Sequence, residues 1–146
     1  ISDKEFILKN IKDDTIDTIS SFHLPQDEES KRLPFEKAAF GAIGLQTLLP
    51  ACLKLVHDKI LDLPTLFKKI SLNPAKLLNL KTGILKEDYP ADLILFDPDK
   101  PFTVDRFKLL SKAKNTPFDG YKLYGEVLKT FVKGNEIYKS RNTIDT

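Results

Sequence analysis

The hydrophobic pattern of this chain changes its period at about Gly83, and that change limits the possible folds more than any other feature. In residues 3–12 and 45–59, apolar side chains recur at the spacing of one helix face. Beyond Gly83 the apolar runs are short and separated by turn residues, which is typical of strands. This order predicts an α/β chain in two parts, residues 1–82 and 83–146.

Local signals predict several shorter elements. Asp62 and Asn73 can each begin a helix with a proline in its first turn, so further helices are predicted over 62–70 and 73–80. Pro50 lies inside the 45–59 pattern and is expected either to kink that helix or to occupy its first turn. Strands are predicted over 15–22, 91–97, 125–132 and 136–138, the last two forming a hairpin at Gly134–Asn135, and the tail 140–146 is expected to be frayed.

Composition excludes several classes of protein. The chain has 146 residues, of which 41% are hydrophobic and 30% charged, as in a globular domain of ordinary size. The net charge of +2 is spread among interspersed signs, which argues against nucleic acid as a partner. No apolar run reaches the roughly 18 residues of a membrane span. The single cysteine, Cys52, cannot form an internal disulfide and suits a cytoplasmic location.

The chain contains no methionine, even at position 1. A translated chain begins with methionine, and its removal before a bulky isoleucine is unfavourable. We therefore expect that Ile1 is not the natural start and that the sequence is a processed, cleaved or truncated segment.

Six motifs occur in one order along nearly the whole chain, and together they resemble dihydroorotases of the amidohydrolase superfamily. Residues 14–26 resemble the family pattern D-G-x-I-D-x-I-A-T-D-H-A-P-H, and residues 37–47 resemble A-P-F-G-x-x-G-L-E-T. The stretch 111–120 resembles S-K-x-x-N-T-P-F-x-G, which favours dihydroorotase over hydantoinase or allantoinase. The remaining three matches lie at Asn73–Gly83, Ala91–Asp97 and Val132–Tyr138.

This resemblance implies a fold. Its members are built on a (β/α)₈ barrel with a small β-sandwich assembled from the two chain ends. Residues 1–82 would supply the C-terminal part of the barrel, namely its last strand at about 17–22 and the helices that follow. Residues 83–146 would supply part of the sandwich. Because barrel strands pair in a closed ring, a lone barrel strand would have two unpaired edges, and we expect the piece to be unstable unless another chain completes it.

The resemblance also implies where catalysis would occur. Active relatives use one or two zinc ions, and a carboxylate at the end of the last barrel strand binds metal and moves a proton. In this sequence that position is Phe22. A phenyl ring has no lone pair for a metal and no titratable proton. We therefore predict neither a catalytic residue nor a metal ligand in this chain, and no zinc in this segment.

Four other positions match the substrate-binding loops of the family: His23, Gln26, Ala39 and Gly41. His23 corresponds to the histidine that follows the catalytic carboxylate, and Gln26 stands where the family has a histidine that helps to bind the substrate carboxylate. Ala39 replaces a proline in a loop whose backbone touches substrate. These residues are interpreted as the remnant of a substrate loop, whereas His57, on a helix face, is expected to be an ordinary surface residue.

Three functions remain open at this point. The first is a catalytically inactive dihydroorotase-like protein of pyrimidine biosynthesis, which supports aspartate carbamoyltransferase structurally and forms a homo-oligomer. The second is the C-terminal fragment of an active zinc-dependent dihydroorotase, or related cyclic amidohydrolase, whose site lies in a missing N-terminal part. The third is a free-standing interaction fragment. In the first two, the remaining N-terminal part of the same protein is an expected partner.

Overall fold

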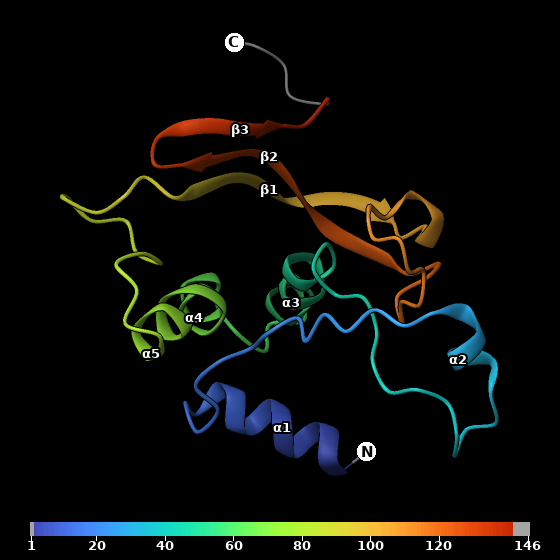
Figure 1. Cartoon of the computed structure of the whole chain (residues 1–146). Helices are drawn as coiled ribbons and strands as arrows, with labels where there is room; N and C mark the ends of the chain where they lie inside the picture. Colours follow the sequence, from blue (N-terminus) through green and yellow to red (C-terminus); the bar gives the residue numbers. More distant parts are fainter. Residues whose placement is uncertain (1, 142–146) are drawn as a thin grey trace.

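A computed structural model describes residues 2–141 of the protein (Figure 1). A three-stranded antiparallel sheet in the order β1-β2-β3 lies over the helices α3, α4 and α5, with α1 on the far side of them. The predicted order, helices before a β unit in a mixed α/β chain, is confirmed. The elements are α1 Ser2–Lys12, α2 Glu28–Arg32, α3 Leu48–His57, α4 Leu63–Phe67, η1 Lys68–Leu72, α5 Asn73–Leu77, β1 Leu93–Thr103, η2 Arg106–Lys108, β2 Lys122–Val132 and β3 Asn135–Lys139.

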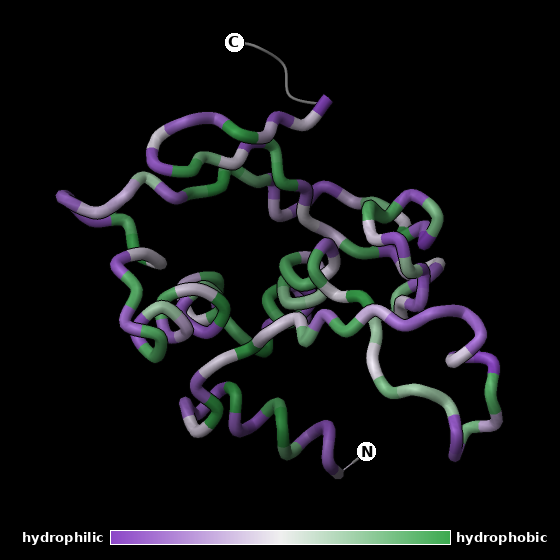
Figure 2. Tube along the Cα trace, viewed as in Figure 1, coloured by the Kyte–Doolittle hydropathy of each residue, from purple (hydrophilic) through white to green (hydrophobic). Residues whose placement is uncertain are grey.

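The core forms where α3 packs between the sheet and α4. Leu53 of α3 and Leu66 of α4 are fully buried, and Phe96 of β1 packs against them. Hydrophobic residues therefore gather on α3 and the strands beside it (Figure 2). The helix predicted over 45–59 forms as Leu48–His57, with Pro50 in its first turn, where a missing N–H leaves no helical bond unmade.

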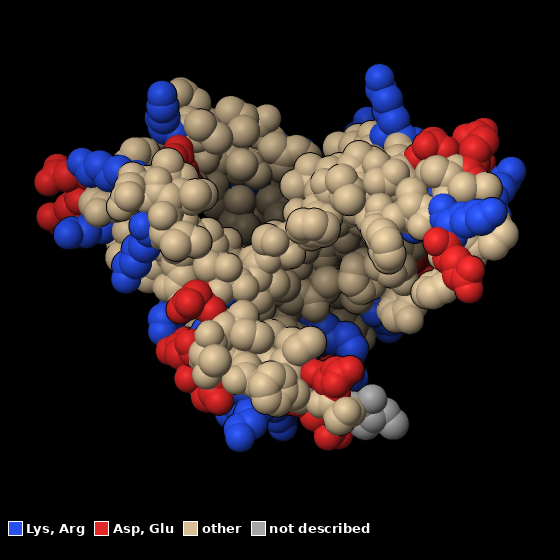
Figure 3. All heavy atoms as spheres, turned by 60° about the horizontal axis from the view of Figure 1, so that its bottom comes forward, with Lys and Arg blue, Asp and Glu red and all other residues tan. Residues whose placement is uncertain are grey.

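Much apolar surface is left outside this core. The predicted helix at residues 3–12 forms as α1, but of its apolar residues only Ile11 is buried, and Phe6 is 68% exposed. Phe35, Phe40 and Leu110 are also largely exposed. Figure 3 shows a face that is hollowed in the middle, where neither basic nor acidic residues gather, with most charges at its periphery. No helix in the described part of the chain is long and apolar enough to cross a membrane.

The two helices predicted over 62–70 and 73–80 form one continuous helical stretch from Leu63 to Leu77. Asp62 begins it as predicted, its carboxylate accepting the Thr65 N–H at 2.8 Å. The expected break before Pro74 is wrong, because the η1 segment is a π-helix. In its wider turn the Asn73 N–H donates to the Lys68 carbonyl five residues back, which accommodates the proline ring that a regular helix would exclude.

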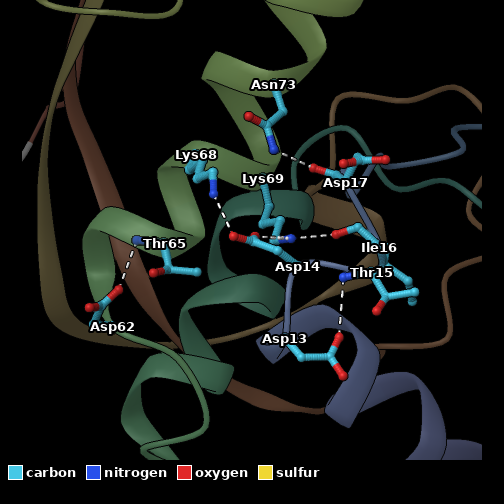
Figure 4. A network of polar contacts seen from close by, with 10 residues as sticks. All are labelled: Asp13, Asp14, Thr15, Ile16, Asp17, Asp62, Thr65, Lys68, Lys69 and Asn73. Carbon is cyan, nitrogen blue, oxygen red and sulfur yellow. Dashed lines mark hydrogen bonds and ion pairs between the residues drawn. The ribbon is translucent and has the colours of Figure 1, made fainter.

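The strand predicted over 15–22 is wrong for this structure. A strand requires a hydrogen-bonded neighbour, and among residues 2–141 none pairs with 15–22; an isolated parallel bridge between His23 and Ala42 lies just beyond its end. Its backbone is held by the helical stretch instead. The Ile19 N–H donates to the Lys69 carbonyl at 3.1 Å, and the Asn73 side chain donates to the Asp17 carbonyl at 2.8 Å (Figure 4).

The same contact contains a buried cation. The Lys69 side chain is fully buried, and its ammonium group donates to the Ile16 carbonyl and lies 2.6 Å from the Asp14 carboxylate (Figure 4). Lys68 approaches the same carboxylate at 2.6 Å. Hydrogen bonds from these two lysines lower the pKa of Asp14 to about 2. Residues 14–19 are therefore tied to the helices by charge as well as by backbone hydrogen bonds.

The sheet is longer than predicted. β1 was expected over 91–97 but runs from Leu93 to Thr103, with register shifts between Leu95 and Phe96 and between Asp97 and Pro101; Pro98 lies in the second gap. The predicted hairpin joins β2 to β3. Its turn is Lys133–Gly134, one residue earlier than expected, with φ of 50° and 79°, as a type I′ turn requires.

The predicted fraying of the tail 140–146 is wrong at its first residue. Ser140 is buried and donates its N–H to the Leu128 carbonyl at 2.7 Å. Residues 142–146 lie outside the described part of the chain.

Candidate functional site

The segments that carry the predicted substrate-loop residues, 21–26 and 38–44, lie side by side. The Leu24 N–H donates to the Ala42 carbonyl at 2.9 Å. A Cβ atom at Gly41, where φ is +117°, would lie 2.6 Å from the Leu24 carbonyl oxygen, and one at Gly44 would lie 2.5 Å from that of Ser21. Both glycines are therefore needed for this close approach.

His23 joins the two segments through its ring. Its Nδ1 accepts the Gly44 N–H at 3.0 Å and the Leu45 N–H at 3.3 Å. An atom that accepts these bonds carries no proton, so the neutral ring holds its proton on Nε2 and can act there only as a donor. Its position in the structure gives His23 a role in fixing the start of the 44–47 turn.

Two side chains that the sequence did not single out hold the 39–41 backbone. The Lys31 ammonium donates to the carbonyls of Ala39 at 2.8 Å and Gly41 at 3.3 Å. The Asn115 amide donates to the same Gly41 carbonyl at 3.0 Å. The carbonyls of this loop are therefore fixed by a cation and an amide from two other segments.

Asn115 also binds the other predicted loop residue. Its Oδ1 accepts the Gln26 N–H at 3.3 Å, and its backbone carbonyl accepts the Ile43 N–H at 3.0 Å. The structure thus brings together His23, Gln26, Ala39 and Gly41. The S-K-x-x-N motif could have pointed to Asn115, whereas Lys31 lies in a charged run with no feature that sets it apart from solvated surface.

Phe22 stands beside this cluster but takes no part in it. Its side chain is 78% exposed, and its backbone has a φ of +41°, which is uncommon for any residue but glycine. The phenyl ring offers no metal ligand, and the His23 Nδ1 is occupied by two N–H donors. Within residues 2–141, no three histidine, cysteine, aspartate or glutamate side chains could hold a metal ion together. The residues present do not fit a zinc site.

A small cleft of about 280 Å³ opens behind His23. The Gln46 side chain accepts the Leu110 N–H there at 2.6 Å, which joins the 44–47 turn to the loop after η2. Apolar atoms make up most of the surface of the cleft. It can hold a small group against the turn, with few polar side chains to act on it. The lining residues are His23, Ile43, Gly44, Leu45, Gln46, Thr47, Leu109, Leu110 and Ser111.

The chain is similar to known proteins along most of its length. The model of the amidohydrolase family matches residues 37–137. The dihydroorotase of Desulforapulum autotrophicum is 42% identical over 138 residues, which are 94% of this chain and 32% of that protein. That of Ehrlichia chaffeensis is 40% identical over 139 residues, 95% of this chain and 31% of the relative. The chain thus spans about a third of the length of these curated relatives.

Solved structures share the fold. The L-hydantoinase (dihydropyrimidinase) from Arthrobacter aurescens superimposes with a TM-score of 0.87 at 30% identity, covering 95% of this chain and 32% of that one. The D-hydantoinase from a Bacillus species, AR9, gives a TM-score of 0.85 at 22% identity, with 96% and 32% covered, and supports the fold alone.

Proposed function

Because this chain belongs to the amidohydrolase family, we propose that it is part of a dihydroorotase-like protein of pyrimidine biosynthesis that is catalytically inactive and serves a structural role. The single observation that carries this proposal is Phe22. The family resemblance puts a metal-binding and proton-transferring carboxylate at this position, and a phenyl ring can perform neither task.

The arrangement around Phe22 supports the same proposal. The loop frame is present, with the close approach at Gly41 and Gly44 and the hydrogen bonds of His23 and Asn115. The groups that would do chemistry are replaced, since Gln26 can donate a hydrogen bond but brings no charge to a substrate carboxylate. A protein that keeps the frame while its reactive groups change retains the shape of an enzyme without its activity.

The proposal includes partners. The relatives are about three times as long as this chain, and its exposed apolar side chains need a cover, because apolar surface of this extent is unfavourable in water. We propose that an N-terminal part of the same protein covers them and supplies the other barrel strands. Residues 1–82 would then be the end of the barrel and residues 83–146 part of the β-sandwich.

The wider assembly follows from the family resemblance. There, inactive dihydroorotase homologues support aspartate carbamoyltransferase, and we propose this enzyme as the partner of a homo-oligomer. A cytoplasmic location belongs to the same proposal and is supported by the single cysteine, which is buried and free.

The test is a cyclisation assay with carbamoyl-aspartate on the protein as the cell makes it, including any chain that adjoins residues 1–146. We expect no turnover above background, and none after Phe22→Asp, because one added carboxylate cannot replace the several ligands that a catalytic zinc requires. Phe40→Asp, at a 90% exposed site in the neighbouring loop, is the matched control for the added charge. Turnover near that of an active dihydroorotase in the unmodified protein would refute the proposal.

The second candidate is an active zinc-dependent dihydroorotase whose site lies outside this chain. Identity of 42% with a dihydroorotase over 138 residues favours it. Zinc analysis of the same purified protein separates the two candidates. Stoichiometric zinc together with cyclisation would select the active enzyme, whereas absence of both would select the structural protein.

A further inference from the structure

A second cleft, of about 890 Å³, lies between α2 and the segment 106–115. It is separate from the cleft beside His23, since the two clefts share no lining residue. Its lining is rich in cations. The charged residues that line it are Asp27, Glu28, Lys31, Arg32, Arg106, Lys112 and Lys114.

Two of these cations are held rigidly on different segments. The Lys114 ammonium donates to the carbonyls of Leu109 and Ser111, both at 2.7 Å, as Lys31 does to two carbonyls of its own loop. Both lysines are partly buried, and among residues 2–141 neither ammonium has a carboxylate within ion-pair distance. Each ammonium has three donors, of which carbonyls use two. Two fixed, partly desolvated ammonium groups thus line this cleft, and each has one N–H donor that no carbonyl uses.

The remaining charged groups leave the cleft positive. Arg32 pairs with Glu28 at 3.4 Å, and Arg106 lies 3.6 Å from Asp119. Lys112 is exposed, with no ion pair or hydrogen bond in the described residues. Asp27 is engaged at the start of α2, where its carboxylate accepts the Ser30 N–H at 2.7 Å. Once the arginine pairs are set aside, three lysines and one acidic side chain, that of Asp27, line the cleft.

We propose that this cleft binds a small phosphate-bearing ligand, with the ammonium groups of Lys31, Lys112 and Lys114 as its contacts. A partly buried cation without a counter-charge is unfavourable, and a bound anion relieves that cost at both lysines at once. Ammonium groups act as point charges that suit the tetrahedral oxygens of phosphate, whereas a planar carboxylate is matched better by a guanidinium fork than by lysines. The site requires no catalytic competence of the chain.

The test is calorimetric titration of the protein as the cell makes it, including any chain that adjoins residues 1–146, with inorganic pyrophosphate at physiological salt. We expect saturable binding that Lys112→Gln weakens about tenfold, a loss of about 1.4 kcal/mol. Lys112 is exposed, so this change leaves the fold intact. Lys108→Gln is the matched control, because Lys108 lies in η2 beside the cleft, is 85% exposed and does not line it. We expect the control to bind as the unmodified chain does.

Further arms can overturn the proposal. Absence of saturable binding, or equal weakening of pyrophosphate binding by Lys108→Gln, would show that the lysines of the cleft act only as unspecific surface charge. Succinate binding as tightly as pyrophosphate would refute the phosphate assignment. Co-sedimentation with phosphatidylglycerol vesicles, without binding of free pyrophosphate, would assign the charges to a lipid headgroup and refute a soluble ligand. Lys114→Met is expected to abolish binding, and if that variant unfolds, Lys112→Gln alone decides.

Discussion

Replacing Asn115 by alanine should loosen the loop cluster around His23 by a predictable amount. The substitution removes two side-chain hydrogen bonds, the one donated to the Gly41 carbonyl at 3.0 Å and the one accepted from the Gln26 N–H at 3.3 Å. Both are partly buried. A neutral hydrogen bond contributes about 1 kcal/mol net, so the free energy of unfolding should fall by about 2 kcal/mol.

Urea unfolding of the chain, followed by far-ultraviolet circular dichroism, measures this loss. Amide hydrogen exchange locates it, because the Gln26 N–H should exchange faster once its acceptor is gone. The Ile43 N–H donates to the backbone carbonyl of residue 115, which alanine retains, so its exchange should change less. The two amides therefore report separately on the lost side chain and on the loop as a whole.

Asn10→Ala is the matched control. Asn10 also donates from its side chain to a carbonyl, that of Phe6 at 2.7 Å, but on an exposed helix. Alanine is the better helix former, so this variant should be unchanged or slightly more stable. The reasoning is refuted if Asn115→Ala stays within about 0.5 kcal/mol of the unmodified chain, the usual range for surface changes, or if Gln26 exchange does not change.

Three further predictions concern the core and its edges. Gly125→Ala should destabilise the chain by about 1–3 kcal/mol through strain at a φ of +109°. The new Cβ would also clash with Leu53 Cδ1, which lies 2.4 Å away. In urea unfolding, the double variant with Leu53→Ala should therefore lose less free energy than the two single variants together. The pKa of Asp14 is lowered from 3.8 to about 2, so the ionised carboxylate should stabilise the fold fully above pH 3.8 and lose this effect as the pH falls towards 2. Asp14→Asn should therefore flatten the curve of unfolding free energy against pH between these values. An unchanged curve would contradict this prediction. Burial raises the pKa of the Cys52 thiol to about 11, so iodoacetamide should label the native chain slowly at pH 8 and the urea-unfolded chain rapidly, and equal rates would exclude the buried site.

The elements that the sequence predicts correctly are those fixed by nearby residues. The Asp62 cap needs only the N–H three residues on, and the β2–β3 hairpin, whose turn lies one residue from its predicted place, needs only two residues that tolerate a positive φ. The helix at Leu48–His57 follows from its own apolar spacing. Local hydrogen bonds and side-chain period settle such features before any tertiary contact forms.

The features that the sequence does not predict depend on residues that are distant in the chain. Asn73–Pro74 looks like the start of a new helix, but packing of the preceding helix extends it through a π-turn that no residue pattern announces. Asn115 acquires its role only because residues 74 positions apart meet at the Gly41 carbonyl, and Lys31 reaches the same carbonyl from 10 positions away. The family resemblance, and no local pattern, singled out His23, Gln26, Ala39 and Gly41, and their proximity in the structure depends on contacts between distant segments.

The segment 15–22 illustrates both cases, because its local pattern predicts a strand whereas its structure depends on distant residues. Its alternating, β-branched residues have the pattern of a strand, yet a strand is a relation between two segments, and residues 2–141 give it no ladder partner. Its backbone atoms at residues 16–19 are bound instead by Lys69 and Asn73, and just beyond its end His23 and Leu24 bind the 42–44 loop. An extended segment fixed at both flanks can accept a neighbouring strand without reorganising. The same contacts place Phe22 beside the loop cluster, at the position where the family resemblance would put a carboxylate.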